Sequence, residues 1–299
     1  MTVGRRSRGR GARPEVAVEV KMKLTVLVDN NTLTDQSFLG ESALSHFIET
    51  EGRKTLFDVG YSDAFITNAR KLHIDLLDVD FVVLSHGHLD HTWGLVPLVR
   101  LYTEGLMEKL PVKKPTLVAH PLMLLPKTLE NLPEVGSLLP EEKLSGFFDV
   151  QLSREPVWLT NRLVFLGEIE RSNDFEAKKP IGKVLGDGVE KDDFLLDDSA
   201  LAYKSRDGLV IVTGCSHAGI CNIVEQARRV CGEGRVVDIV GGLHLLDPSA
   251  EQLQGTLEYL RALRPGSLHA CHCTDLRSKI ALSRVVDLKE VGVGLALEY

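Results

Sequence analysis

The chain has 299 residues, of which 43% are hydrophobic and 6% aromatic, so it is long enough to bury the core of one large domain. Its formal net charge of −7 at pH 7 argues against a general nucleic-acid-binding protein. No apolar run has the length of a membrane span, so we expect a soluble protein with a small-molecule substrate and neither a nucleic-acid nor a membrane partner.

The five cysteines all lie in the last third of the chain, and their odd number does not suit a disulfide framework. With no secretory signal in view, this predicts reduced thiols and a cytoplasmic location. The first residues are basic and rich in glycine. We therefore expect a disordered basic tail over 1–15 and a domain over 16–299.

The first predicted elements are a strand over 24–28, a hairpin formed by 45–49 and 54–59, and a helix that begins at Ser62. The hairpin ends at Asp58. An Asp at this position can cap the end of the strand.

Residues 81–95 carry the strongest motif of the chain. Phe81 to Ser85 read as a buried strand, and the run His86-Gly87-His88-Leu89-Asp90-His91 follows directly. His86 and His88 project the same way from an extended turn and can hold one metal ion, while Asp90 and His91 can reach a second ion beside it. The alternative is a solvated loop whose histidines bind no metal.

A second strand, over 209–213, ends in a similar way at Gly214-Cys215-Ser216-His217, and a helix follows. The likeness to 81–91 predicts two matching halves that face each other, which places His217 beside His86 and His88 as a third ligand. Two later strands end near His244 and His272. The alternation of strands with helices is typical of an α/β layer fold.

The H-x-H-x-D-H run after an apolar strand resembles the motif of the metallo-β-lactamase superfamily. This resemblance implies a four-layer αββα sandwich with the metal site along one edge of its two sheets. It also implies that His272, at a late strand end, joins Asp90 and His91 at the second ion. For Asp58 it implies a second reading, in which the carboxylate orients a ligand instead of capping the strand, and neither reading is favoured. Two zinc ions are expected, with manganese or iron as alternatives, and no organic cofactor.

One position departs from this pattern. Many members of the superfamily carry a Gly-Asp pair after the strand of the second half, and its carboxylate bridges both ions. Here Cys215 stands near the place of that Asp. We therefore expect an unusual pair of sites, one of them weaker or filled by a metal other than zinc.

Three further segments, 214–220, 241–245 and 271–274, resemble one subgroup of the superfamily. Members of this subgroup are described as similar to the synthase that joins a dihydropterin to ribofuranosylaminobenzene 5'-phosphate. The resemblance extends over nearly the whole chain after about residue 22. It indicates the subgroup more strongly than it indicates that substrate.

Two regions are candidates for contact with the substrate. Proline and glycine interrupt the Leu-rich residues 121–152, which predicts a lid-like insertion or a dimer contact, so the oligomeric state is left open. A charged loop is expected over 173–198. Around it, the predicted substrate-binding residues are Arg171, Lys178, Lys179 and, at the end of another strand, His120.

The leading hypothesis is a metal-dependent hydrolase that acts on a small anionic ester, thioester or phosphoester through a metal-activated water. Asp90 would orient the nucleophile and His244 would assist the leaving group, which makes them the predicted catalytic residues. One alternative is the pterin synthase or transferase, which should show an aromatic or amide-lined slot. The other is a non-catalytic metal-binding or redox protein that uses the thiols of Cys215, Cys271 and Cys273.

Overall fold

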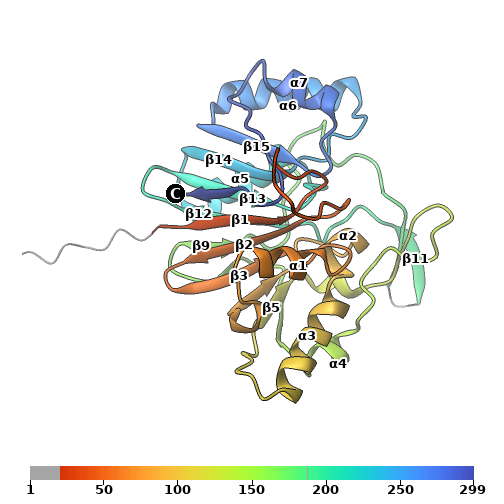
Figure 1. Ribbon diagram of the computed structural model, residues 1–299. Coiled ribbons are helices and arrows are strands. Elements are labelled where there is room, and N and C mark those ends of the chain that lie inside the picture. The colour runs from red at the N-terminus through yellow and green to blue at the C-terminus, as the bar shows by residue number, and fades with distance from the viewer. Residues whose placement is uncertain (1–20, 187) are drawn as a thin grey trace, which may run out of the picture.

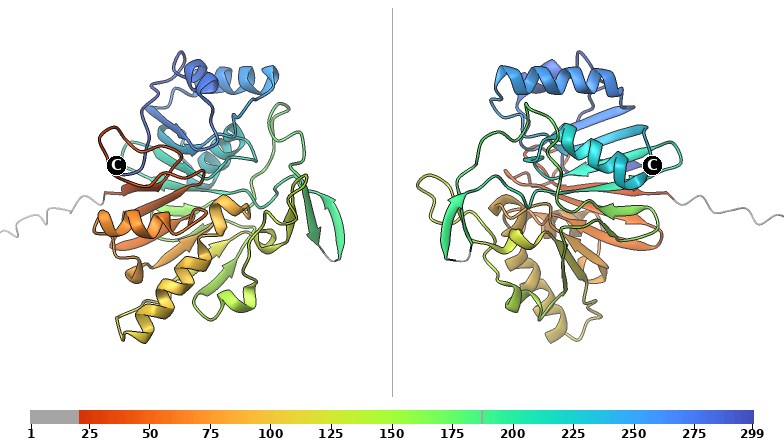
Figure 2. Two further views of the ribbon diagram at one scale, coloured as in Figure 1. Left: turned by 45° about the vertical axis from the view of Figure 1, so that its right-hand side comes forward. Right: turned by 180° about the vertical axis from the view of Figure 1, so that it is seen from behind.

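The computed structural model describes residues 21–186 and 188–299, so the predicted tail over 1–15 and the predicted start of the domain at residue 16 lie outside the described residues. Two large β-sheets lie face to face, and helices cover the outer face of each (Figures 1 and 2). This is the predicted four-layer αββα sandwich. Within the described ranges, no helix is both long and apolar enough to cross a membrane.

The first sheet has seven strands in the order β16-β1-β2-β3-β4-β5-β7. Their bounds are Lys23–Val28 (β1), Ser45–Thr50 (β2), Arg53–Phe57 (β3), Phe81–Val83 (β4), Thr116–Ala119 (β5), Asp149–Leu152 (β7) and Ala296–Glu298 (β16). Strands β3, β4, β5 and β7 are parallel, so their carboxyl ends share one edge. Helices α1 (Ala64–Lys71) and α3 (Leu95–Met107) pack on its outer face.

The second sheet has six strands in the order β15-β14-β13-β12-β9-β8. Their bounds are Val157–Trp158 (β8), Leu163–Phe165 (β9), Ala200–Lys204 (β12), Leu209–Thr213 (β13), Val236–Gly242 (β14) and Ser267–Cys271 (β15). Strands β13, β14 and β15 are parallel. Three helices cover the outer face of this sheet: α5 (Ile220–Cys231), α6 (Ala250–Leu263) and α7 (Leu276–Leu282).

Strand β13 shows why the central strands read as unbroken apolar runs. Leu209 and Ile211 belong to the core between this sheet and its helices, whereas Val210 and Val212 belong to the core between the two sheets. Successive side chains of a strand point to opposite faces, and here both faces are covered. Positions 209–212 are therefore all apolar, whereas Thr213 at the end of the strand donates its hydroxyl to the carbonyl of Gly242 at 2.9 Å.

A third, small sheet has the order β11-β10-β6, with bounds Lys127–Thr128 (β6), Lys183–Gly186 (β10) and Val189–Asp192 (β11). The hairpin β10–β11 lies inside the predicted charged loop, so a loop over all of 173–198 is wrong. All four residues of β11 are exposed, and an exposed strand leaves no apolar alternation in the sequence. Residues 149–152 form β7 of the first sheet, and the lid-like role of the rest of 121–152 stays a prediction.

Two helices follow the strand β4, separated by a short break. Residues 89–92 form the short α2 (Leu89–Thr92) and α3 starts at Leu95, with Gly94 between them. A Cβ atom on Gly94 would lie 1.9 Å from the carbonyl oxygen of Val59, so only glycine permits this close approach. The remaining short elements are η1 (Leu76–Asp78), η2 (Pro121–Leu124) and α4 (Glu141–Leu144).

A buried ion network connects the small sheet to the metal loop. The Nζ atom of Lys127 lies 2.7 Å from a carboxylate oxygen of Asp193 and 2.9 Å from one of Asp197. The other oxygen of Asp197 accepts a hydrogen bond of 2.8 Å from the backbone N–H of Gly87, between His86 and His88. The position of the metal loop therefore depends on Lys127.

We expect Lys127→Met to lower the free energy of unfolding by about 3–5 kcal/mol, because it leaves two buried carboxylates without their cation. The matched control is Lys183→Met in the same sheet, where Lys183 pairs with Asp192 at 2.7 Å in an exposed position. That change should leave the free energy of unfolding nearly unchanged, because solvent screens an exposed ion pair. Urea denaturation of both variants measures the difference, and equal losses would contradict the structural role of Lys127.

Candidate metal centre

The residues of the site come from five strand ends at one edge of the sandwich. In the first sheet, β3 leads into Asp58 and β4 into the metal loop, His86 to His91. In the second sheet, β13, β14 and β15 lead into the segments that contain His217, His244 and His272. A cavity of ≈ 870 Å³ lies over these ends. The geometry brings His217 and His272 to the metal loop, and their role as metal ligands stays a prediction.

The first ligand cluster consists of His86, His88 and His217. The Nε2 atom of His86 lies 3.1 Å from Nδ1 of His88 and 3.1 Å from Nε2 of His217. Burial lowers the pKa of all three imidazoles, that of His88 to about 4. They are therefore neutral at pH 7, which is the form of histidine that binds a metal ion.

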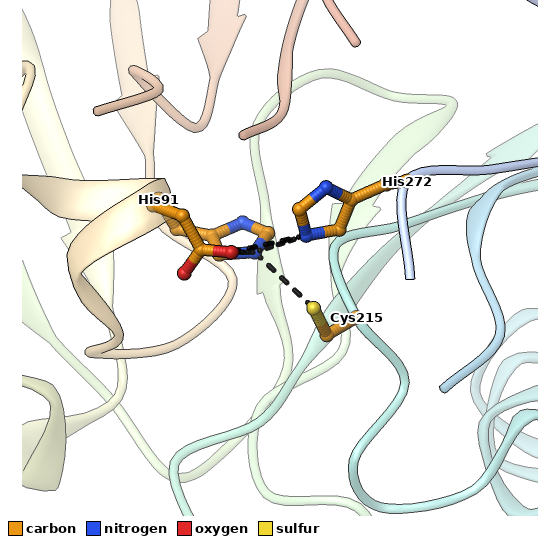
Figure 3. Close-up of side chains that lie close together, drawn as sticks. His91, Cys215 and His272 are labelled. Carbon is orange, nitrogen blue, oxygen red and sulfur yellow. Dashed lines mark hydrogen bonds and ion pairs between the residues drawn. The ribbon is translucent and has the colours of Figure 1, made fainter. Parts of the chain in front are cut away.

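The second ligand cluster consists of Asp90, His91, Cys215 and His272. Figure 3 shows the rings of His91 and His272 and the sulfur of Cys215 pointing to one place. The Nε2 atom of His91 lies 3.2 Å from Nε2 of His272 and 3.3 Å from Sγ of Cys215. The Oδ2 atom of Asp90 is 3.2 Å from Nε2 of His272. The predicted ligands thus lie in two neighbouring clusters, and their binding of metal stays a prediction.

Asp58 holds both clusters in place. Its Oδ2 atom accepts a hydrogen bond of 2.7 Å from Nδ1 of His91, and the amide and hydroxyl of Ser85 also donate to this carboxylate, each at 2.7 Å. The Ser85 hydroxyl in turn accepts from Nδ1 of His86 at 2.9 Å. Both rings therefore present Nε2 to the cluster. Of the two readings of Asp58, the structure favours the one in which it orients its neighbours.

Other polar contacts prepare the second cluster. Asp29 accepts from the backbone N–H of His272 at 2.9 Å, and the amide oxygen of Asn30 lies 3.3 Å from its Nδ1. Burial lowers the pKa of His91, but the carboxylates of Asp90 and Asp58 outweigh it and raise the pKa to about 9. Burial also raises the pKa of the Cys215 thiol. The raised pKa values mean that His91 and Cys215 hold protons beside these carboxylates. A metal cation at this place would replace those protons and balance the negative charge instead.

The two predicted catalytic residues both line the cavity. Asp90 belongs to the second cluster, and the ring of His244 lies 4.2 Å from that of His217, measured between centroids. The backbone N–H of His244 donates to the sulfur of Cys273 at 3.2 Å. Its Nδ1 atom is buried without a hydrogen-bond partner in the part of the chain that is described. His244 is thus held by its backbone while its ring stays available to a substrate.

The structure does not bring the four predicted substrate-binding residues to the cavity wall that it describes. Arg171 donates to the backbone carbonyl groups of Phe194 and Leu195. Lys178 and Lys179 are exposed. His120 is buried and bonds to Glu168 at 3.0 Å. Their charge was visible in the sequence, but their distance from the strand ends was not.

An aromatic pair at the cavity was missed. The rings of Tyr61 and Trp93 stack with centroids 5.2 Å apart and an angle of 22° between their planes. Both line the cavity, together with five apolar side chains: Leu89, Leu129, Leu132, Val135 and Leu246. Trp93 follows the metal motif by two residues, and this position was the available signal. The described lining contains the acids Glu41 and Glu134 but neither lysine nor arginine.

Comparison with known proteins agrees with this geometry. Residues 40–108 match the family model of the metallo-beta-lactamase superfamily. A 7,8-dihydropterin-6-methyl-4-(beta-D-ribofuranosyl)-aminobenzene-5'-phosphate synthase from Methanocaldococcus jannaschii is 32% identical over 280 residues, which cover 86% of this chain and 89% of that protein. The chain belongs to the metallo-β-lactamase superfamily.

Two further proteins are similar to this chain. The uncharacterised protein MJ0448 of the same organism is 26% identical over 262 residues, covering 88% of this chain and 94% of that protein. The solved structure of Tm1679, described as a metal-dependent hydrolase of the beta-lactamase superfamily, is 27% identical with a TM-score of 0.77. The match covers 93% of this chain and 99% of the Tm1679 chain. The fold that the motif implied is thereby confirmed.

We expect Asp58→Asn to weaken zinc binding by about 10–100-fold while the chain still folds, because the change removes the charge that orients His91. Competition with a chelator of known affinity measures this. Asp80→Asn is the control, because Asp80 caps the amide of Lys54 at 2.8 Å just before β4, away from both clusters. Zinc affinity of Asp58→Asn equal to that of the wild type would contradict the assigned role.

Proposed function

We propose that this protein is a metal-dependent hydrolase that directs a metal-activated water at a small anionic ester, thioester or phosphoester. One observation carries the proposal. In the described chain the first cluster supplies three ligands, and two of them, His88 and His217, face the cavity. Catalytic zinc sites have three protein ligands and leave the fourth position to water or substrate.

The residues present fit zinc, because neutral imidazole, carboxylate and cysteine thiolate are its usual ligands. The two clusters support two zinc ions, one in each cluster. Manganese or iron are the alternatives where nitrogen and oxygen atoms bind the ion. A bound ion would act as a Lewis acid and lower the pKa of its water to about 7. The cavity volume supports a small-molecule substrate, and we propose neither a nucleic-acid nor a membrane partner.

The other groups of the site suit acid–base roles. Burial raises the pKa of Asp90, but His91 and His272 outweigh it and keep the pKa well below its usual range. Asp90 is therefore an anion that can accept a hydrogen bond from the nucleophile. Burial lowers the pKa of His244, whereas Cys273 raises it by more. His244 can thus carry a proton and donate it to the leaving group.

We expect His88→Ala to reduce turnover by at least about 100-fold, because it removes a predicted metal ligand. Even the loss of a residue that only hydrogen-bonds to a metal ligand typically lowers metal affinity or activity by about 10–100-fold. Lactam, thioester, phosphodiester and pterin substrates, tested on protein of known metal content, provide the assay. His73→Asn is the control, because His73 is exposed and its φ of 57° suits asparagine. Undiminished turnover of His88→Ala at saturating metal would contradict the proposal.

A second candidate is the synthase or transferase that joins a dihydropterin to ribofuranosylaminobenzene 5'-phosphate. The observation that favours it is the stacked pair Tyr61 and Trp93, which forms an aromatic part of the cavity wall. The 32% identity to the archaeal synthase supports the same reading. Since the described lining has no lysine or arginine, the phosphate group would depend on the metal ions for its countercharge.

Tyr61→Leu tests this candidate, because it removes an exposed aromatic face and retains an apolar side chain. If a pterin ring packs there, its affinity should fall about 2–10-fold, corresponding to about 0.5–1.5 kcal/mol for an aromatic pair. Tyr61→Phe should keep the wild-type affinity, and the KM for an aliphatic ester should be the same in both variants. An equal loss of affinity for the pterin and for the aliphatic ester would contradict an aromatic substrate.

A further inference from the structure

The mouth of the cavity is apolar although it faces solvent. Tyr61 is 45% exposed, Leu132 51% and Leu246 68%, and all three line the cavity. They come from separate segments: Tyr61 lies between β3 and α1, Leu132 after β6, and Leu246 after β14. Three large apolar side chains that meet water at one opening are unfavourable until an apolar group covers them.

The wall below the mouth is also apolar, and hydrogen bonds hold it in position. Trp93, which stacks on Tyr61, donates its Nε1–H to the carbonyl of Gly136 at 2.8 Å. The backbone groups of Leu129 and Leu132 exchange hydrogen bonds of 2.8 and 3.3 Å, which close a tight turn. Hydrogen-bonded backbone thus presents aromatic and aliphatic side chains to the cavity. A wall of this kind is formed before a ligand arrives.

The charges of the cavity lie at different levels. The described wall contains the carboxylates of Glu41 and Glu134 and neither lysine nor arginine. Glu41 accepts a hydrogen bond of 3.1 Å from the backbone N–H of Tyr61, and Glu134 accepts one of 2.6 Å from that of Gly136. Among the described residues, only the histidines and the proposed ions at the floor can supply positive charge. An anionic group of a ligand that lies far from the floor would therefore meet carboxylates without a countercharge.

We propose that the substrate carries any negative charge only at its scissile group, and that the rest of it is an apolar alkyl or aryl substituent packed against Tyr61, Leu132 and Leu246. These three residues then determine specificity, while the clusters at the floor carry out the chemistry. The substrate class is an apolar ester or thioester, or a phosphodiester with a single charge. A second phosphate or carboxylate at the far end of the molecule is selected against. This inference rests on the proposed hydrolase function and deepens it.

Two esters with the same leaving group test the substrate class. One is 4-nitrophenyl hexanoate, and the other is the same ester with a sulfonate at the end of its acyl chain. A sulfonate binds metal ions weakly, so the comparison reports on the mouth and not on the floor. We expect the wild type to show a KM at least about 10-fold higher for the sulfonate ester, because burial of each methylene group is worth about fourfold in affinity and the charged end keeps the chain in water. The value of kcat should be similar for both esters, since the scissile group is the same.

Lysine at the mouth should reverse part of this preference. Leu132→Lys and Leu246→Lys each place an ammonium group where the side chain is already exposed, so the fold should tolerate them. We expect either change to lower the KM for the sulfonate ester by about 2–5-fold, the range of an exposed ion pair, and to raise the KM for the hexanoate. Leu276→Lys is the matched control, because Leu276 is 74% exposed and lies outside the cavity lining. It should keep the wild-type ratio of the two KM values.

Binding is also measured without turnover. Pentyl 4-nitrophenyl ether and its analogue with a terminal sulfonate contain no ester bond, and their nitrophenyl group quenches tryptophan fluorescence. The chain has two tryptophans, and Trp158 is exposed and outside the cavity lining. The titration therefore uses Trp158→Phe, in which the signal comes from Trp93 alone. We expect the pentyl ether to bind at least about 10-fold more tightly than the sulfonate.

The two assays let the hydrolase and its substrate class fail separately. Equal binding of the two ethers, tighter binding of the sulfonate, or no quenching by either would overturn the apolar mouth even if esters are hydrolysed. Equal KM values for the two esters, or a KM ratio that neither Leu132→Lys nor Leu246→Lys changes, would overturn it as well. Preference for the pentyl ether without turnover of any ester, thioester or phosphoester would reject the hydrolase and retain the apolar binding site.

Discussion

The carboxylate of Asp58 is the contact on which the rest of the centre depends. It lies between the end of β3 and the metal loop, where it binds the ring of His91 directly and that of His86 through Ser85. One buried anion thus fixes the tautomers of two ligands that belong to different clusters. The four-layer fold brings this anion to the edge at which the parallel strands of both sheets end.

The sequence predicted the parts of the centre that follow from local pattern. Apolar runs with polar ends gave the central strands. The likeness of the two halves brought His217 to the metal loop, and the resemblance to the superfamily brought His272 there. The sequence did not decide between the two roles of Asp58, because a strand cap and an orienting carboxylate occupy the same position in a sequence pattern. Its partner Ser85 carries no sequence signal of its own.

The features that the sequence did not predict depend on where distant segments lie in the folded structure. Lys178 and Lys179 were predicted as substrate contacts because of their charge, and they are exposed and away from the cavity lining. Tyr61 reaches the cavity through its stack on Trp93, a contact between residues 32 positions apart (93 − 61). Strand β11 escaped detection because it has no buried face. Charge and periodicity are local properties, whereas a cavity wall is assembled from distant segments.

The buried network of Lys127 has a consequence for how the cavity opens. Lys127 connects the start of the segment after η2 to Asp197, which holds the amide of Gly87 between two metal ligands. A swing of the whole small sheet would separate these charges and disturb the ligands at the same moment. Any opening motion that preserves the metal centre must therefore pivot beyond Lys127. The cavity residues Leu129 and Leu132 lie on that side, whereas the backbone N–H of Val135 donates to the carbonyl of Lys127 at 2.8 Å. A change of shape at the entrance that spares the metal loop would therefore be confined to residues 128–133.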